Sequence, residues 1–361
     1  MTLLTRAGAA EGVTAPRGPV APSGHGLPRA HVLPRAHVST AGRARRAGGS
    51  VLAIAAQAAV VLVIASLATF ALGAASGSDP AAVALGDQAT PEDVARLNHE
   101  FGLDRPFLVR YLSWLGGALA GDLGRSWYSG IPVAQSIAQA FPVSLSIALG
   151  ATLVAIVLGG ATGILAAVRR GTVIDRVVAA VNAALATVPA FVAGIALILL
   201  FAFAIPVFPV GGYVPPTISV SAWLLCLVLP SVSLSLDAAS DLSRQLRTSL
   251  VGALSQNYVV GATVHGLPRR RIVWGHALPN ALGPALATLG LHVPRLVGGA
   301  VITEAVFGMP GLGQLARQSA LTGDVPVVQG VLLASVALVV ATAAVINLVL
   351  ARVATGDRSA A

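Results

Sequence analysis

Long apolar stretches are the feature of this sequence that most restricts its fold. A helix that crosses a bilayer needs about 20 mostly apolar residues, and six stretches of the chain meet that requirement. They cover residues 51–75, 143–168, 178–205, 221–239, 282–306 and 327–352. Only 10% of the 361 residues are charged, whereas soluble domains carry about 25%. The sequence therefore predicts an all-α, polytopic membrane protein with six transmembrane helices.

Arginine placement predicts the orientation of these helices. The chain has 23 basic residues, every one of them Arg, against 14 acidic residues. Seventeen of the 23 lie before the first stretch, between the second and third, between the fourth and fifth, or after the sixth. Because cytoplasmic loops are enriched in Arg, we expect a multi-pass protein of the plasma (inner) membrane with both termini in the cytoplasm. No nucleic-acid partner is expected, because the Arg residues flank apolar spans.

The ends of the chain differ in composition from the apolar part. Residues 1–48 are rich in Ala, Arg, Gly and Pro and contain a direct repeat, residues 27–32 and 33–38. Such composition is typical of a disordered tail, with contact to anionic lipid as the alternative. We expect a cytoplasmic tail over 1–48, a six-span domain over 49–352 and a second cytoplasmic tail over 353–361. The first apolar stretch is longer than a signal peptide needs, so an uncleaved anchor is expected.

The segment 76–141 is predicted to be a long extracellular loop with amphipathic helices. Thr90 fits the N-cap of a helix, Pro91 its first position, and Asp93 completes a capping box. A second helix is expected from Pro106, with Tyr and Trp side chains that favour the membrane interface. This helix would lie along the outer surface of the bilayer or form a small packed cap, and the sequence leaves both open.

The segment 241–280 is predicted to be a cytoplasmic elbow. Leucines recur every four residues over its first part, a helical spacing: Leu242, Leu246, Leu250 and Leu254. The sequence Gly266-Leu267-Pro268 ends that helical pattern, and three Arg residues, 269–271, begin the next element. A loop of this length in a compact protein is usually functional, so the elbow is expected to contact a partner.

At this elbow the chain resembles the membrane subunits of binding-protein-dependent ABC importers. The family pattern reads Glu-Ala-Ala, three residues, Gly, nine residues, and Ile-x-Leu-Pro. At that spacing the chain has Val260-Gly261-Ala262, Gly266 and His276-Ala277-Leu278-Pro279, without the glutamate. Four further blocks resemble the peptide and nickel branch of the family, and the resemblance covers residues 49–352. These blocks are residues 101–106, 121–126, 304–313 and 324–330.

The resemblance implies a fold, a site and partners. The fold would be the type I ABC importer permease architecture, with the elbow seated as a coupling helix in a groove of a cytoplasmic ATPase. Gly266 would be required because a side chain there would be in the way, and Pro279 would end the elbow and begin a membrane helix. The coupling residues implied are Tyr258, Gly261, Ala262, His265, Gly266, Leu267, Leu278 and Pro279. The partners implied are a second permease subunit in a heterodimer, two ATPase subunits or domains, an extracytoplasmic substrate-binding protein and membrane lipid.

Catalysis and cofactor binding are not expected of this chain. It contains neither a phosphate-binding Gly-x-x-x-x-Gly-Lys sequence nor any Lys. ATP would therefore be hydrolysed by the partner subunits, and the chain would not be an enzyme. Cys226 is the only cysteine, which excludes a disulfide framework within the chain.

Four ionisable residues inside the apolar spans are candidates for the pathway wall, because such residues usually face a cavity or one another. They are Asp237, His292, Arg295 and Glu304. For His292 and Arg295 the alternatives are an internal partner such as Asp237 or snorkelling to the outer interface. For Glu304 the alternative is a structural hydrogen-bond acceptor role. Asp237 is expected closer to the cytoplasm than Arg295, so a direct pair between them is not predicted.

The function predicted is therefore that of an ABC importer permease subunit, forming half of a pathway for short peptides. Nickel or another small solute is the alternative substrate, although no metal-ligand cluster lines the spans. An ion-coupled secondary transporter is the alternative of another class. It would require mid-membrane acids and usually an inverted repeat, and the sequence has few such acids and no evident repeat.

Overall fold

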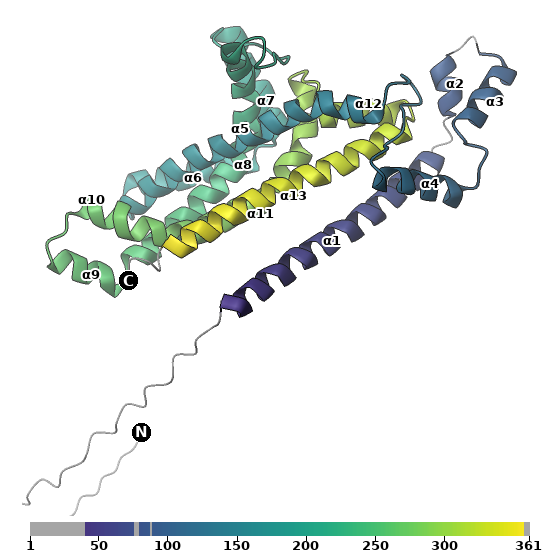
Figure 1. Cartoon of the computed structure of the whole chain (residues 1–361). Coiled ribbons are helices and arrows are strands. Elements are labelled where there is room, and N and C mark those ends of the chain that lie inside the picture. Colours follow the sequence, from purple (N-terminus) through teal and green to yellow (C-terminus); the bar gives the residue numbers. More distant parts are fainter. Residues whose placement is uncertain (1–39, 76–78, 87–88, 357–361) are drawn as a thin grey trace, which may run out of the picture. The chain divides into compact units, whose positions relative to one another are not determined.

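The computed structural model describes residues 40–75, 79–86 and 89–356, and this part of the chain is built of helices (Figure 1). The first half contains α1 (Thr40–Ala75), α2 (Pro80–Leu85), α3 (Pro91–Glu100), α4 (Phe107–Leu119), α5 (Val133–Val168), α6 (Val173–Thr187), α7 (Ala190–Ile198) and the π-helix η1 (Leu199–Ala204). The second half contains α8 (Val220–Leu254), α9 (Asn257–Val264), α10 (Arg269–Ile272), the π-helix η2 (Val273–Ala277), α11 (Leu278–Val306), α12 (Leu312–Leu321) and α13 (Val325–Gly356). Arg125 and Pro132 form an isolated β-bridge, and the described residues include no strand. The predicted all-α class is confirmed.

The chain divides into two units, Met1–Leu52 and Ala53–Ala361. The described residues of the first unit, 40–52, are the beginning of α1. The expected tails over 1–48 and 353–361 lie largely outside the described residues and stay predictions. All contacts reported below belong to the second unit.

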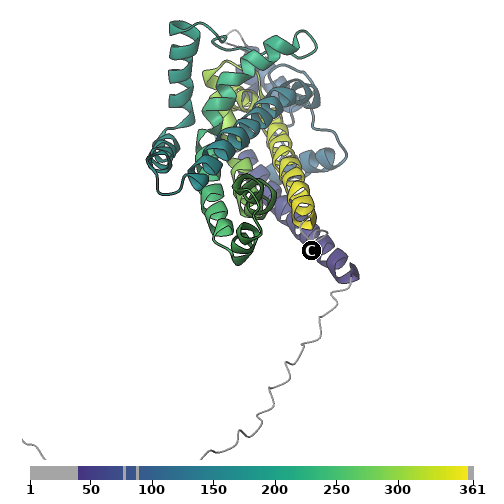
Figure 2. The ribbon, with the colours of Figure 1, turned by 90° about the vertical axis from the view of Figure 1, so that its left-hand side faces the viewer.

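A bundle of long helices forms the core of the second unit. Helix α8 packs along α5 on one side and along α11 on another, and α13 packs against α11 and α5 (Figure 1, and turned by 90° in Figure 2). Leu250, Ile147 and Leu289 are among its fully buried side chains. Most other members of this core on α5 and α11 are alanines. Small residues allow helices in a membrane to approach closely, where packing rather than water exclusion drives association.

Two glycines set the distance between α5 and α8. A Cβ atom on Gly159 would lie 2.6 Å from the carbonyl oxygen of Ala239, and one on Gly163 would lie 2.8 Å from that of Ser243. Neither distance leaves room for a side chain. The two glycines are four residues apart and so lie on one face of α5, the arrangement of a Gly-x-x-x-Gly helix contact.

The predicted number of six membrane spans is not confirmed. By length and composition, four segments of the described chain qualify, Val133–Val168, Val220–Leu254, Arg269–Val306 and Val325–Thr342. The stretch expected over 178–205 is instead a pair of helices, α6 and α7 with η1, bent by 102°. Pro189 explains the break, because a residue before proline avoids the helical region, and Val188 is extended with φ −83° and ψ 118°. The apolar part of α1, Ala59–Ala75, is a shorter helix.

Several predicted helix boundaries are corrected. The fourth stretch was expected to end at 239, but α8 continues to Leu254, so its leucines at 242, 246 and 250 belong to the bundle core. The second was expected to begin at 143, but α5 begins at Val133 and continues through Pro142. Prolines are tolerated inside such helices because neighbouring groups can satisfy the carbonyl that the missing N–H leaves free. One turn later, the hydroxyl of Ser146 donates to the carbonyl oxygen of Pro142 at 2.6 Å.

The helices expected within 76–141 are present. The Thr90 hydroxyl oxygen accepts from the backbone N–H of Asp93, and Pro91 is the first residue of α3. The same hydroxyl donates to the Asp93 carboxylate at 2.7 Å, which keeps the pKa of Asp93 below its ordinary value. Helix α4 packs one face against α1, where Tyr111 and Ser66 share a hydrogen bond of 2.9 Å. Its other face exposes Leu108 and Leu112, so α4 has both a packed face and an apolar outer face.

Candidate functional site

The predicted elbow is a short helix that stands clear of the bundle core. No residue of α9 is buried, and its apolar side chains Val260 and Val264 are exposed to 61% and 80%. The backbone N–H of Leu267 donates to the carbonyl oxygen of Ala262 at 3.1 Å, which closes the end of the helix. Exposed apolar side chains on a protruding helix are typical of a surface that a partner covers.

Gly266 makes the turn after α9 for a different reason from the one expected. No heavy atom lies within 4 Å of a Cβ atom built on this glycine, so a side chain would not be obstructed. Its φ is +76°, a left-handed conformation that costs other residues about 1 kcal/mol. The turn therefore needs glycine for its backbone conformation and not for space.

Pro279 does not separate the elbow from the membrane helix. Helix α10, the π-helix η2 and α11 follow one another without a gap, and the residues Arg269–Val306 form one apolar segment. Pro279 lies in the first turn of α11, as expected for the beginning of that helix, but the chain before it continues as helix and not as a separate elbow. Asn280, one residue later, donates to the Tyr258 hydroxyl at 3.4 Å and to the His276 carbonyl at 3.0 Å, which connects α9 to the beginning of α11.

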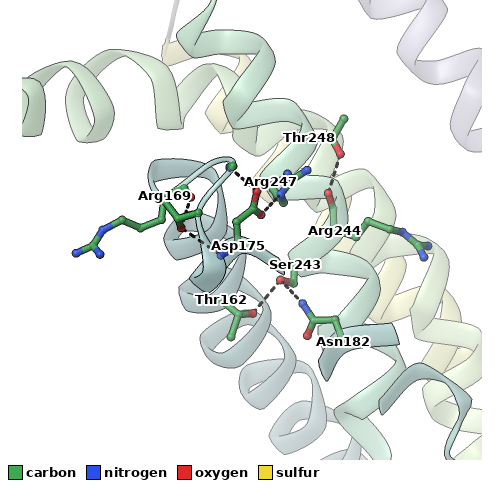
Figure 3. Close-up of polar contacts among 10 residues, drawn as sticks. Thr162, Arg169, Asp175, Asn182, Ser243, Arg244, Arg247 and Thr248 are labelled. Atoms are coloured by element: carbon green, nitrogen blue, oxygen red, sulfur yellow. Dashed lines mark hydrogen bonds and ion pairs between the residues drawn. The ribbon is translucent and has the colours of Figure 1, made fainter. Parts of the chain in front are cut away.

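Behind the elbow, polar side chains connect α5, α6 and α8 (Figure 3). The Arg247 guanidinium donates to both oxygens of Asp175, from Nε at 2.6 Å and from Nη2 at 2.7 Å. The backbone N–H of Gly171 also donates to Asp175, at 2.9 Å. One turn earlier on α8, the Ser243 hydroxyl accepts from Asn182 at 2.8 Å and from Thr162 at 2.9 Å. The beginning of α6 and the end of α5 are thus attached to the same stretch of α8.

Helix α10 reaches the same region through Arg269. Its Nη2 donates to the carbonyl oxygen of Val168, the last residue of α5, at 3.3 Å. This hydrogen bond joins α10 to the end of α5.

A second polar cluster connects the central parts of α8 and α11. His292 is buried, and its Nε2 lies 3.0 Å from Asp241 Oδ2 while its Nδ1 lies 3.5 Å from Asp237 Oδ2. Arg244 pairs with Asp241 at 2.7 Å. Arg295 lies 4.0 Å from Asp237, so these two residues meet even though a direct pair was not expected. One turn of α8 separates the two aspartates, which explains how both reach one imidazole.

Glu304 lies apart from this cluster and is fully buried. Its carboxylate accepts from the Ser144 hydroxyl at 2.6 Å and from the backbone N–H of Gln314 at 3.0 Å. The Ser144 oxygen in turn accepts from the backbone N–H of Leu312 at 2.8 Å. Gly311 leaves the room for this carboxylate, since a Cβ there would overlap it. The alternative role of Glu304 as a structural acceptor is the one that this geometry supports.

Two of the other sequence blocks also meet in space. Asp324 is buried and accepts from the Ser126 hydroxyl and from the backbone N–H of Trp127. Gln329 donates from Nε2 to the carbonyl oxygen of Ser66 on α1 at 2.7 Å. These contacts connect the loop that precedes α5 to the beginning of α13, and α13 to α1.

The structure brings Asp237, His292 and Arg295 into one cluster, an arrangement that the sequence did not predict. The ion pair between Asp175 and Arg247 was not predicted either. The spacing Thr172-x-x-Asp175 is a capping-box pattern that could have marked the start of α6. No feature of the sequence pointed to Arg247 as its partner, because 72 positions separate the two residues.

Comparisons with known proteins agree with this architecture. Residues 159–356 match the family model described as binding-protein-dependent transport system inner membrane component, and residues 51–148 match the model of its N-terminal part. A putative peptide transport system permease protein of Brucella abortus is 37% identical over 78% of this chain and 90% of its own length. A probable D,D-dipeptide transport system permease protein of Escherichia coli is 34% identical over 75% of this chain and 86% of its own length.

Two further similarities are more distant. The dipeptide transport system permease protein of Escherichia coli is 32% identical over 73% of this chain and 85% of its own length. A solved inward-facing methionine ABC transporter aligns with a TM-score of 0.46 and 19% identity, over 62% of this chain and 96% of that chain.

Proposed function

This chain belongs to the inner-membrane components of binding-protein-dependent transport systems, and we propose that it forms half of an ATP-driven import pathway for short peptides. It is a multi-pass inner-membrane protein of the peptide branch of that family. The observation that carries the peptide assignment is 37% identity with a peptide permease along 90% of that relative's length. Nickel or another small solute remains the competing substrate.

The elbow is the proposed contact with a cytoplasmic ATPase. Support comes from α9, whose exposed apolar side chains include Val260 and Val264 and whose turn depends on Gly266. Asn280 of α11 donates to Tyr258 of α9, and Arg269 of α10 donates to the end of α5. An ATPase that displaced α9 would therefore pull on membrane helices, and this chain would supply no ATP site or cofactor of its own.

The remaining assembly is also a proposal. A second permease would complete the pathway, in a heterodimer, with two ATPase subunits or domains and an extracytoplasmic binding protein. Both termini are proposed to be cytoplasmic. The contact of Arg269 with Val168 supports this orientation, because it brings the Arg-rich segments at 169–176 and 269–271 to one end of the bundle, as Arg enrichment of cytoplasmic loops requires.

Uptake into proteoliposomes tests the proposal. The chain is reconstituted with a second permease, ATPase subunits and an extracytoplasmic binding protein, and supplied with labelled dialanine or with nickel. Peptide uptake that requires ATP and the binding protein is the expected result. Nickel uptake without peptide uptake would replace the substrate assignment, and uptake that requires an ion gradient and no ATP would refute the importer mechanism.

A further inference from the structure

The central charged cluster contains one pair of side chains that is open to solvent. Asp241 has a partner on each oxygen, Arg244 on Oδ1 and His292 on Oδ2. Asp237 and Arg295 differ, because their side chains are 51% and 72% exposed and lie 4.0 Å apart. At that separation neither charge is enclosed by the other, so both remain accessible to a third charged group.

Helix α8 exposes little else in this region. From Cys226 to Ser243, Asp237 is the only exposed residue of the helix. It lies near the middle of the span Val220–Leu254. The bundle therefore covers this part of α8 except at one carboxylate.

Helix α11 has a matching exposed stripe. Leu291, Gly298 and Ile302 are exposed on it, and Arg295 is its only charged member between Pro284 and Ile302. Nothing lies within 4 Å of a Cβ built on Gly298, one turn beyond Arg295. The surface of α11 is therefore uncovered one turn beyond Arg295.

Such a pair is not suited to face lipid. Charged side chains in the centre of a span are costly to expose to hydrocarbon and mark pathways or internal partners. Arg295 lies within the central half of the segment Arg269–Val306, and its only ion-pair partner among the described residues, Asp237, is distant. A water-filled pathway accounts for the exposure of the Asp237 side chain and for that of the Arg295 side chain.

We propose that Asp237 and Arg295 form a site in the pathway that binds the two charged ends of a peptide. The Asp237 carboxylate would accept from the α-ammonium group, and the Arg295 guanidinium would donate to the α-carboxylate in a forked geometry. His292, held by Asp241, positions Asp237 from the buried side. Because every short peptide has both ends whatever its side chains, this site suits a pathway that passes many sequences. The proposal rests on the peptide function proposed above.

Equilibrium binding to the assembled permease–ATPase complex, without binding protein, tests it. The probes are dialanine, N-acetyl-dialanine and dialanine amide. The intact complex is expected to prefer dialanine to each blocked form by about fivefold, the effect of one partly hydrated ion pair. Arg295→Gln should remove the preference for dialanine over dialanine amide and keep the preference over N-acetyl-dialanine. Asp237→Asn should do the reverse. If these residues have only a structural role, each substitution would weaken the binding of all three probes equally.

Controls separate the outcomes. Arg317→Gln changes an exposed Arg on α12 and should bind and transport as the unmodified complex does. The proposal is overturned if both site variants keep both preferences, or if they fail to assemble with the second permease while Arg317→Gln assembles, which would make this face a subunit interface. Peptide uptake by the unmodified complex is measured in parallel, so that loss of the proposed function itself is seen separately.

Discussion

Arg247 on α8 holds Asp175 at the beginning of α6 with two hydrogen bonds, of 2.6 and 2.7 Å. The Asp175 side chain is 7% exposed and that of Arg247 is 35% exposed. This contact attaches the α6 region to the central bundle through a bidentate ion pair, whose carboxylate side is shielded from water. It lies close to the elbow, where the proposed ATPase contact would apply force.

Replacement of Arg247 should destabilise the protein markedly. Arg247→Gln removes the counter-charge and the forked donor of the Asp175 carboxylate, so the midpoint temperature of unfolding should fall by more than it does when an exposed ion pair is broken. Arg247→Lys should restore little of the lost stability, because Lys lacks the planar fork of donors that binds both carboxylate oxygens. Thermal unfolding of the purified protein in detergent measures the effect.

Arg244→Gln is the matched control for that prediction. Arg244 lies three residues earlier on the same helix and pairs with Asp241 at 2.7 Å, but its side chain is 74% exposed. An exposed pair of this kind contributes about 0–1 kcal/mol. Equal losses from the two variants would show that the burial of Asp175 has no special effect.

Gly159 should not tolerate a methyl group. Gly159→Ala places a Cβ 2.6 Å from the carbonyl oxygen of Ala239, so α5 and α8 must separate, at a cost of about 1–3 kcal/mol. Gly160→Ala is the control, because nothing lies within 4 Å of its Cβ. The midpoint temperatures of the two variants in thermal unfolding should differ clearly, and similar midpoints would contradict the close contact.

Gly266 should be sensitive to the backbone preference of its replacement. Gly266→Ala is expected to cost about 1 kcal/mol because φ is positive, whereas Gly266→Asn should cost less because Asn visits this region more readily. Both substitutions should lower the rate of peptide-stimulated ATP hydrolysis because they misplace α9 relative to α10. Gly266→Ala should lower it more than Gly266→Asn.

Gly252→Ala, on α8 just before the elbow, provides the comparison. This glycine also has open space around a Cβ, but its φ is not positive, so alanine should preserve both folding and coupling. Co-purification with ATPase subunits separates assembly from turnover. If Gly266→Ala couples as well as Gly252→Ala does, the turn has no part in coupling.

Ser144 should be required for the contact between α5, α11 and α12. Its hydroxyl donates to Glu304 and accepts from the backbone N–H of Leu312, so Ser144→Ala leaves a buried N–H unsatisfied, at about 1–3 kcal/mol. Ser146→Ala removes a hydroxyl that bonds only within its own helix and should be nearly neutral. The difference in unfolding temperature between these two variants is the measurement, and no difference would exclude a role for Ser144 in holding α12.

The sequence by itself determined the helical class, most of the membrane segments and the place of the elbow. Apolar length predicts a spanning helix without knowledge of its neighbours, which is why the cores of α5, α8, α11 and α13 were found. Thr90 and Pro91 likewise predicted the start of α3, because capping depends on residues close in the chain. The elbow was found through its spacing around Gly266, a local pattern shared with a family.

Only the tertiary structure decided which helices meet and what their polar residues do. Periodicity shows that a helix has an apolar face but not which helix covers it, so neither the approach of Gly159 to α8 nor the pair of Asp175 with Arg247 could be predicted. The same limit applied to His292, whose partners Asp237 and Asp241 come from another helix. Pro189 was visible in the sequence, but the 102° bend after α6 depends on how the following segment packs. Contacts between distant residues are set by packing in three dimensions, and the linear sequence specifies them only through the fold.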